Sequence, residues 1–281
     1  MKVTNKYNIP HNIALAMTPK EWTPDPQRIG VTDLIDGPLP RTLRIKHYDN
    51  LVIDVSDGFY SFLGTMTDAL VKKCAGPWDL VRVKLEYESE YGLTLVGKPD
   101  WINVLDKKLV DLKYTSVWSS LRGEKDEWIK QVNVYDWLVR KITGGRIEIG
   151  ALEIHVIMRD WVTTKAGQGD YPKMPVKVFK IDRWSEKEQE DFIMSRLEDH
   201  VNNPMRECTP DEKWQTANSY AVMKKGQKRA VRVLSSEAEA LQYMKERKLS
   251  NKTYSIEKRP GACRKCEQYC AVKEFCPFVD F

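Results

Sequence analysis

The stretch GKPDWINVLDKKLVDLK, residues 97–113, decides how this chain folds. Residues 101–105 and 108–113 alternate apolar and polar side chains as strands do, and Asp106-Lys107 between them suits a hairpin turn. A hairpin through that turn brings Asp100, just before the first strand, close to Asp111, near the end of the second. The stretch therefore predicts two carboxylates at one point of a β-sheet.

The sequence on either side of this hairpin predicts an α/β core over residues 46–203, in which helices flank a central mixed sheet. The expected helices are 57–73, 127–142 and 185–202, and the further strands are 80–87, 93–96 and 147–158. Prolines 10, 19, 24, 26, 38 and 40 predict an irregular arm over residues 1–45, with at most a short helix near 31–35. Residues 204–260 read as a small α+β insert, and residues 261–281 as a cysteine-rich tail.

Composition narrows the class of protein. The chain has 281 residues, 42% of them hydrophobic, and a net charge of +5, which allows a nucleic-acid partner without requiring one. No apolar run reaches about 18 residues and no apolar signal core follows Met1, so we expect a soluble cytoplasmic protein with no membrane partner. No GxxxxGK[ST] loop is present, which argues against an ATP-driven helicase or motor in this chain.

Two carboxylates held this close would repel each other, and a divalent cation would relieve the repulsion. Mg²⁺ or Mn²⁺ suits such an all-oxygen site, to which the Leu112 carbonyl would add a neutral ligand. Asp111 and Lys113 are two residues apart on one strand, so they share a sheet face. The Lys113 ammonium beside the metal would orient or deprotonate a water that attacks a phosphodiester. An isolated Asp-x-Lys is common in a charged chain, so the pairing with Asp100 carries the argument.

Gln131 and Tyr135 form an i, i+4 pair on the helix that follows, and both face one way. They reach either the metal site or a bound strand of DNA, although simple core packing explains Tyr135 equally well.

Gly97-x-Pro99-Asp100, Asp111-x-Lys113 and Gln131-x-x-x-Tyr135, in this order and spacing, resemble the RecB-like branch of the PD-(D/E)XK nuclease superfamily. The match covers residues 55–160 and implies a restriction-endonuclease-like core. It also implies that Asp100 and Asp111 bind metal, that Lys113 assists the nucleophilic water, and that Gln131 and Tyr135 position the strand.

The function that this resemblance implies is metal-dependent hydrolysis of DNA. An exonuclease on single-stranded or end-bearing DNA, in phage or mobile-element recombination or repair, is the first expectation, with a recombination or helicase protein as a further partner. The alternatives are a structure- or sequence-specific endonuclease on the same core and a catalytically weak DNA-binding accessory protein.

One motif departs from the family. Members often carry a metal-binding histidine in a Gly-Thr-x-x-His helix, whereas this chain reads Gly64-Thr65-Met66-Thr67-Asp68. Asp68 is either an oxygen ligand for the same hard cation or an ordinary aspartate on a helix surface. The missing imidazole is the reason for the accessory-protein alternative.

The tail gathers Cys263, Cys266, Cys270 and Cys276 within fourteen residues, a spacing typical of metal binding. Either zinc or a [4Fe-4S] cluster accepts four thiolates, and Cys276-Pro277 is a common end to iron–sulfur motifs. The resemblance favours iron–sulfur, with Cys266, Cys270 and Cys276 as ligands and either Cys263 or Cys208 as the fourth. Such a cluster would staple the tail in place. Cys74 reads as a buried thiol.

A basic turn between two expected strands of the insert contains Lys224, Lys225, Lys228 and Arg229, which either contact DNA phosphates or form a solvated hairpin tip. Most tryptophans belong to the core, but Trp118, just past Lys113, is placed to stack on a base. His155 lies inside an apolar strand and is expected to be a core histidine.

Overall fold

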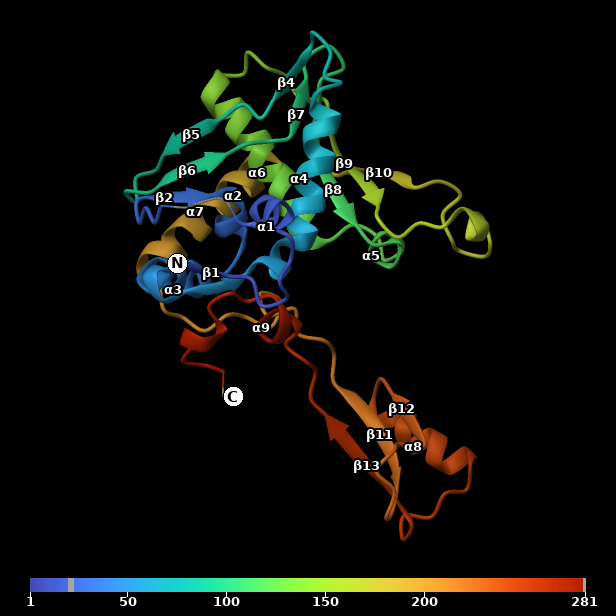
Figure 1. Ribbon diagram of the computed structural model, residues 1–281. Helices are drawn as coiled ribbons and strands as arrows, with labels where there is room; N and C mark the ends of the chain where they lie inside the picture. Colours follow the sequence, from blue (N-terminus) through green and yellow to red (C-terminus); the bar gives the residue numbers. More distant parts are fainter. Residues whose placement is uncertain (20–22, 280–281) are drawn as a thin grey trace. The chain divides into compact units, whose positions relative to one another are not determined.

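The computed structural model describes residues 1–19 and 23–279, which divide into two compact units, Met1–Arg206 and Glu207–Phe281 (Figure 1). The N-terminal unit has mixed α/β architecture with helices around mixed sheets, as predicted. Within the described part of the chain, no helix combines the length and the apolar character needed to cross a bilayer.

A five-stranded sheet forms the centre of the N-terminal unit. Its strand order is β10-β9-β8-β7-β4, and only β8 and β9 run parallel, so the sheet is mixed. The strands are β4 (Asp79–Val81), β7 (Trp101–Asn103), β8 (Lys108–Thr115), β9 (Ala151–Met158) and β10 (Val176–Ile181). The two long central strands carry the buried residues Leu109, Val110, Leu152, Ile154 and Val156.

The predicted hairpin is confirmed. β7 and β8 pair antiparallel with Trp101 opposite Val110, a register that places Asp100 and Asp111 at neighbouring positions across the pair. The connection is a turn over residues 104–107, in which Lys107 adopts a left-handed φ of 53°. The hairpin therefore brings the two carboxylates to one point of the sheet.

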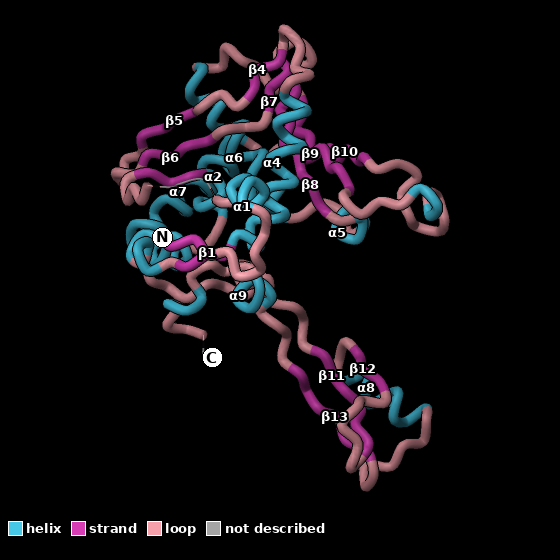
Figure 2. The backbone as a smooth tube through the Cα atoms, viewed as in Figure 1, coloured by secondary structure: helices cyan, strands magenta, loops and turns pink. Residues whose placement is uncertain are grey.

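Two long helices pack against this sheet and a third packs on one of them, and Figure 2 shows the helices in cyan and the strands in magenta. α4 (Phe59–Lys72) contacts β8, α6 (Asp126–Thr143) contacts β8, β9 and β5, and α7 (Glu186–Asn202) packs on α6. α6 buries Trp137, Leu138 and Val139 completely and ends at Gly144, which has the left-handed conformation common at helix ends. Ser185 and Glu188 form a capping box that starts α7.

The predicted strand over residues 80–87 is wrong, because the run divides between two sheets. Asp79–Val81 is β4 of the central sheet, whereas β5 (Leu85–Glu88) pairs with β6 (Thr94–Gly97) in a second sheet that β2 (Arg28–Gly30) completes. Arg82 has a φ of 48°, a conformation that an extended strand does not allow, and it marks the break. Alternation alone did not reveal this turn.

The irregular arm predicted for residues 1–45 is also wrong. The described part of this segment contains β1 (Lys2–Thr4), α1 (His11–Met17), α2 (Val31–Ile35) and α3 (Pro38–Lys46), and β1 pairs with β3 (Val52–Asp54). Pro38 occupies the first turn of α3, where its missing N–H costs no hydrogen bond, and Pro10 precedes α1. Pro10 and Pro38 thus stand at the starts of helices. Pro19 lies outside the helices and strands, and residues 20–22 of the predicted arm are outside the described part of the chain.

The helix α4 and the cysteine that follows it are more exposed than their sequence suggests, and the predicted burial of Cys74 is wrong. The helix predicted over 57–73 forms as α4, but none of its residues is buried, and Phe59, Met66 and Leu70 are 44%, 45% and 63% exposed. Cys74, just after this helix, is exposed rather than buried. The helical spacing predicted the helix correctly. An amphipathic pattern, however, does not show whether another part of the protein covers the apolar side of the helix.

The C-terminal unit contains a three-stranded antiparallel sheet with strand order β12-β11-β13 and one helix against it. Its elements are β11 (Ser219–Lys224), β12 (Arg232–Leu234), α8 (Glu237–Glu246), β13 (Tyr254–Arg259), α9 (Arg264–Gln268) and the short 3₁₀ turn Lys273–Phe275. Val222, Ala240 and Met244 form the small core between the sheet and α8.

In the N-terminal unit, α5 (Val117–Leu121) follows β8.

His200, near the end of α7, makes the N-terminal unit sensitive to acid. It is 4% exposed, and burial, followed by the charges of Arg196 and Arg41, lowers its pKa to about 4. The unfolded chain, with an ordinary histidine pKa near 6.5, takes up the proton first as the pH falls. We expect the free energy of unfolding to decrease by about 3 kcal/mol from this residue between about pH 6.5 and pH 4.

Urea unfolding across this pH range checks the expectation, with His200→Leu as the matched variant because leucine cannot take up a proton. The wild type should lose stability relative to His200→Leu as the pH falls. Parallel pH profiles for the two proteins would show that His200 is not the cause.

Candidate active site

Four elements of the N-terminal unit bring the predicted site residues together. Asp68 comes from α4 and Asp100 immediately precedes β7. Asp111 and Lys113 lie on β8, and Gln131 and Tyr135 on α6. The site is therefore assembled from segments up to 67 residues apart, from 68 to 135, and its geometry depends on the packing of α4 and α6 against β8.

Lys113 links the strand to the helix. Its Nζ lies 2.7 Å from Asp111 Oδ2 and donates a 2.7 Å hydrogen bond to Gln131 Oε1. Gln131 Nε2 in turn donates to the Tyr135 hydroxyl at 3.0 Å. Tyr135 is also 6% exposed, so core packing and orientation of the site are both roles of this one side chain.

Gly97, in β6, leaves the space that Tyr135 occupies. A Cβ built on Gly97 would lie 2.5 Å from Leu138 Cδ1 and 3.2 Å from the Tyr135 ring, closer than side chains pack. The glycine of the Gly97-x-Pro99-Asp100 motif thus lets α6 approach the sheet near the site.

Asp100 is oriented by the backbone of the neighbouring strand. The Leu112 amide donates to Asp100 Oδ2 at 2.7 Å, and the Arg82 amide donates to the Asp100 carbonyl at 3.1 Å. The first bond uses the N–H of Leu112 and leaves open the predicted role of its carbonyl as a metal ligand. The first bond holds the Asp100 carboxylate beside the strand that carries Asp111, and the second holds the Asp100 backbone beside the residue that follows β4.

Sequence reasoning missed two cations at this site, Lys72 and Arg82. Lys72 Nζ contacts Asp68 Oδ1 and lies 3.4 Å from Asp100 Oδ1, so the ammonium bridges two carboxylates. The Arg82 guanidinium donates to Asp68 Oδ2 at 2.8 Å. Lys72 was detectable, because it lies one helical turn after Asp68, whereas nothing in the sequence places Arg82 here. The Asp68 side chain is only 15% exposed and faces the other two acids, unlike an ordinary surface aspartate.

The electrostatics of the site centre on Asp111, whose side chain is 4% exposed. Burial raises the pKa of its carboxyl, the Lys113 ammonium lowers it, and the charges of Asp100 and Asp68 raise it further. Burial, followed by the charge of Asp111, likewise raises the pKa of the Tyr135 hydroxyl. Tyr135 is therefore a neutral hydrogen-bonding group at physiological pH.

The donor set suits a hard divalent cation. Asp111 Oδ2 and Asp68 Oδ1 are buried, and despite their ammonium neighbours neither receives a hydrogen bond of normal geometry from a described residue. Carboxylate oxygens of this kind are what Mg²⁺ and Mn²⁺ prefer. As arranged, however, no three His, Cys, Asp or Glu side chains among residues 1–19 and 23–279 converge closely enough to hold a metal ion. Lysines occupy the space between the acids instead.

The predicted cluster cysteines all lie in the C-terminal unit. No disulfide links cysteines within the described part of the chain. Burial raises the pKa of Cys266, and Cys263, Cys270 and Cys276 raise it further through their charges, so these four lie within electrostatic range of one another. Cys263 directly precedes α9, and its backbone forms an isolated antiparallel β-bridge with the backbone of Gln215. This grouping is compatible with Cys263 as the fourth ligand, and Cys208 remains the alternative.

The other predicted contact residues lie on elements that do not carry the carboxylates. Lys224, Lys225, Lys228 and Arg229 follow or end β11 in the C-terminal unit. Trp118, on α5, is 69% exposed and lines a hollow of about 500 Å³ with Tyr171 and Lys165. His155 is half-buried rather than fully in the core, and one ring nitrogen lies 2.8 Å from Glu153 Oε2.

Comparison with known proteins gives only distant structural likenesses. No protein-family model matches the chain, and no curated protein does. Among solved structures, the protein SSO0001 aligns over 66% of this chain and 82% of its own, at 16% identity and a TM-score of 0.44. A phage-related exonuclease from Haemophilus somnus 129PT aligns over 50% of this chain and 66% of its own, at 16% identity and a TM-score of 0.32. Likenesses this weak add nothing to the case made by the site itself.

Proposed function

We propose that the N-terminal unit is a metal-dependent DNA nuclease that hydrolyses phosphodiester bonds. The observation that carries the proposal is the contact chain from Asp111 through Lys113 and Gln131 to Tyr135. Asp68 and Asp100 lie within electrostatic range of Asp111, and Lys72 bridges the two. This arrangement agrees with the sequence resemblance to RecB-like PD-(D/E)XK nucleases, including its glutamine–tyrosine pair.

Asp100 and Asp111 would hold Mg²⁺ or Mn²⁺, with Asp68 and the Leu112 carbonyl as further oxygen ligands. When bound, such a cation stabilises charge on the phosphodiester and lowers the pKa of water. Asp68 supplies the carboxylate where relatives often carry a histidine, and an oxygen ligand suits these hard ions better than an imidazole does.

The protein side chains have separable roles. The Lys113 ammonium, held between Asp111 and Gln131, is positioned to hold the attacking water and to place positive charge beside a phosphate. Gln131 fixes the position of Lys113, and the Tyr135 hydroxyl fixes Gln131 through a neutral hydrogen bond. The burial of Asp111 keeps bulk water away from these charges and strengthens their interactions.

Linear and covalently closed circular DNA separate the functional alternatives. Full-length protein with Mg²⁺ or Mn²⁺ should degrade end-labelled linear DNA and leave closed circles intact, as an exonuclease does. Cleavage of circles would support the endonuclease alternative. Binding without cleavage of either substrate would support the accessory-protein alternative and contradict the proposed nuclease activity.

We also propose that the cysteines of the C-terminal unit hold a [4Fe-4S] cluster, or zinc, as a structural staple. Cys266, Cys270 and Cys276 are the common ligands, with Cys263 or Cys208 as the fourth. The electrostatic grouping around Cys266 supports this. A brown protein that absorbs at about 400 nm indicates iron–sulfur, and a colourless protein containing zinc indicates the alternative.

A further inference from the structure

Positive charge is concentrated in residues 219–259, which span β11, β12, α8 and β13 and are called the basic module below. This module has eleven Lys and Arg residues against four Asp and Glu, a net charge of +7. The whole chain carries +5, so the remainder of the protein carries −2. The charge that makes the chain basic is thus confined to a segment of 41 residues.

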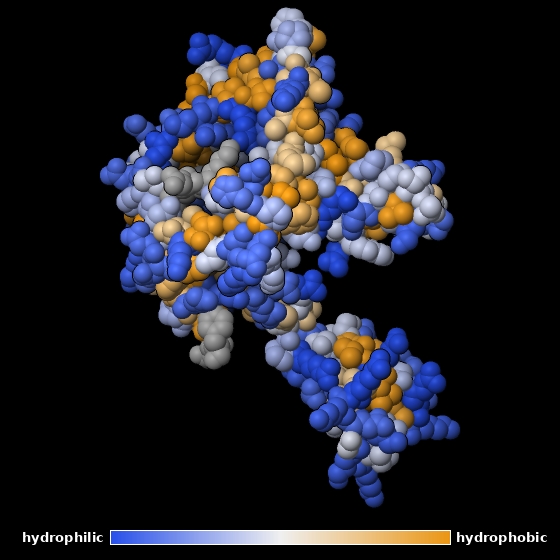
Figure 3. Space-filling view, viewed as in Figure 1, coloured by the Kyte–Doolittle hydropathy of each residue, from blue (hydrophilic) through white to orange (hydrophobic). Residues whose placement is uncertain are grey.

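The module exposes one face of its sheet. α8 covers the face that carries Val222, whereas Ala221 and Met223 on β11 point to the other side, as alternation along a strand requires. Val233 pairs with Ala221 and is 49% exposed, and Val231 beside it is 44% exposed. Figure 3 shows hydrophilic side chains gathered over the module around a small apolar patch.

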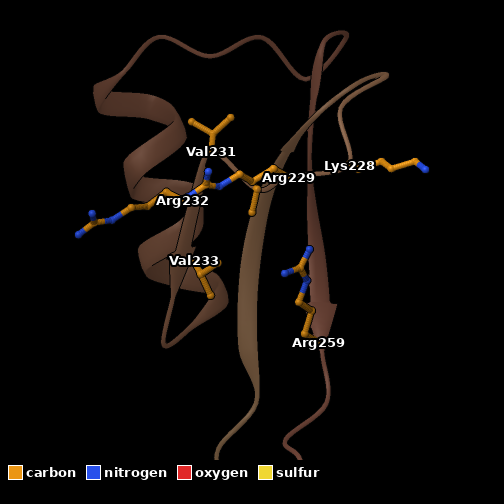
Figure 4. Close-up of a pocket in the computed structure, with 7 residues that line it drawn as sticks. Lys228, Arg229, Val231, Arg232, Val233 and Arg259 are labelled. Carbon is orange, nitrogen blue, oxygen red and sulfur yellow. The ribbon is translucent and has the colours of Figure 1, made fainter.

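A hollow of about 590 Å³ lies on this module, shown in Figure 4. Four of its seven lining residues are cationic and none is acidic; the lining consists of Lys228, Arg229, Ala230, Val231, Arg232, Val233 and Arg259. Arg259 lies along the sheet, donating from Nε to Glu257 at 2.9 Å and approaching the Met223 sulfur at 3.5 Å. The hollow is therefore lined by cationic and small apolar side chains.

Three of the four cations that line the hollow are not neutralised. Lys228, Arg229 and Arg232 are exposed and make no side-chain hydrogen bond or ion pair with any residue in 1–19 or 23–279, whereas Arg259 pairs with Glu257. Exposed Lys225 and half-buried Lys224 next to them also make no such contact within these ranges. At the candidate active site, by contrast, each acid has a cationic neighbour. Unpaired cations on one surface repel each other, and a polyanion relieves that repulsion.

We propose that the hollow bordered by Lys228, Arg229 and Arg232 binds the phosphodiester backbone of DNA. The inference rests on the proposed function and deepens it, because it assigns a second DNA-binding surface outside the catalytic residues. No aromatic side chain lines the hollow, so base stacking does not contribute, and the contact reads phosphates without regard to sequence.

The test is the salt dependence of DNA binding by the full-length protein in EDTA, where cleavage does not interfere. Fluorescence anisotropy with labelled single-stranded and duplex oligonucleotides compares wild type with the triple variant Lys228→Gln, Arg229→Gln, Arg232→Gln. Losing three phosphate contacts should weaken binding at least about tenfold and flatten the slope of log K against log salt, by roughly 2.7 for duplex and 2.1 for single strands.

A matched variant removes the same charge from the same module. Lys245→Gln, Arg247→Gln, Lys248→Gln neutralises three exposed cations at the end of α8, which the hollow does not include. This variant should bind nearly as the wild type does. Circular dichroism verifies that both triple variants are folded, as expected for exposed positions.

Three results would overturn the inference: an unchanged salt slope in the first variant, equal losses in both variants, or displacement of DNA by polyglutamate as effectively as by unlabelled DNA. The last result would assign the hollow to an acidic protein. Failure of the proposed nuclease is distinguishable, because a protein that binds DNA through the hollow but cleaves none with Mg²⁺ or Mn²⁺ leaves this inference standing.

Discussion

Lys113→Met is expected to abolish cleavage, reducing the rate by about 10²–10⁴-fold, the usual contribution of a group that positions or transfers a proton. Methionine keeps much of the length of the side chain and removes the ammonium that contacts Asp111 and Gln131. Initial rates on end-labelled linear DNA with saturating Mg²⁺ or Mn²⁺ measure the effect. DNA binding in EDTA should change little by comparison.

Lys108→Met is the matched control, because Lys108 begins the same strand and its charged group contacts Glu153 rather than the site. It should cleave at close to the wild-type rate. A Lys113→Met protein that retains full activity would show that the site has been assigned to the wrong residues.

Asp111→Asn is expected to abolish cleavage by a similar factor and, in chelator, to raise the melting temperature. The stabilisation follows from the raised pKa of the Asp111 carboxyl, since burial and two neighbouring acids make its ionised form unfavourable in the folded protein. Asparagine has nearly the same shape and no charge. Thermal unfolding followed by circular dichroism, in EDTA, measures the change.

The double variant Asp111→Asn, Lys113→Met separates catalytic from structural effects. Lys113→Met alone leaves a buried carboxylate without its ammonium, at a cost on the order of 2 kcal/mol, because Lys113 itself keeps 22% exposure. The double variant should recover that stability and remain inactive. Asp106→Asn, in the exposed hairpin turn, should change neither property. A lower melting temperature for Asp111→Asn than for wild type would contradict the account of the buried charge.

The sequence predicted those parts of the fold that depend on local pattern. The turn at residues 104–107, the helical repeat and Gly144 end of α6, and the Ser185 capping box of α7 are signals a few residues long, and the hairpin that pairs Asp100 with Asp111 follows from them. The proximity of Gln131 to Lys113 does not follow from such local signals, because it depends on how α6 packs on β8.

What the sequence concealed depends on tertiary context. Arg82 interrupts an otherwise regular alternation through its φ angle, and its guanidinium then reaches Asp68 from a segment 14 residues away. Pro38 and Pro40 read as helix breakers, although a proline in the first turn favours a helix. α4 shows helical spacing whether or not a partner surface covers it. In each case the local signal is compatible with two outcomes, and distant contacts select one.

Lys72 has a practical consequence for handling the protein. Its ammonium already bridges Asp68 and Asp100, and Lys113 already accompanies Asp111, so folding does not depend on a divalent ion to hold the three acids together. The N-terminal unit is therefore expected to keep its fold in a chelator of divalent ions while it is mixed with a nucleic acid. Rapid addition of Mg²⁺ or Mn²⁺ then gives a defined starting point for time-resolved measurements, in which we expect the Lys72 side chain to move away from Asp68 and Asp100.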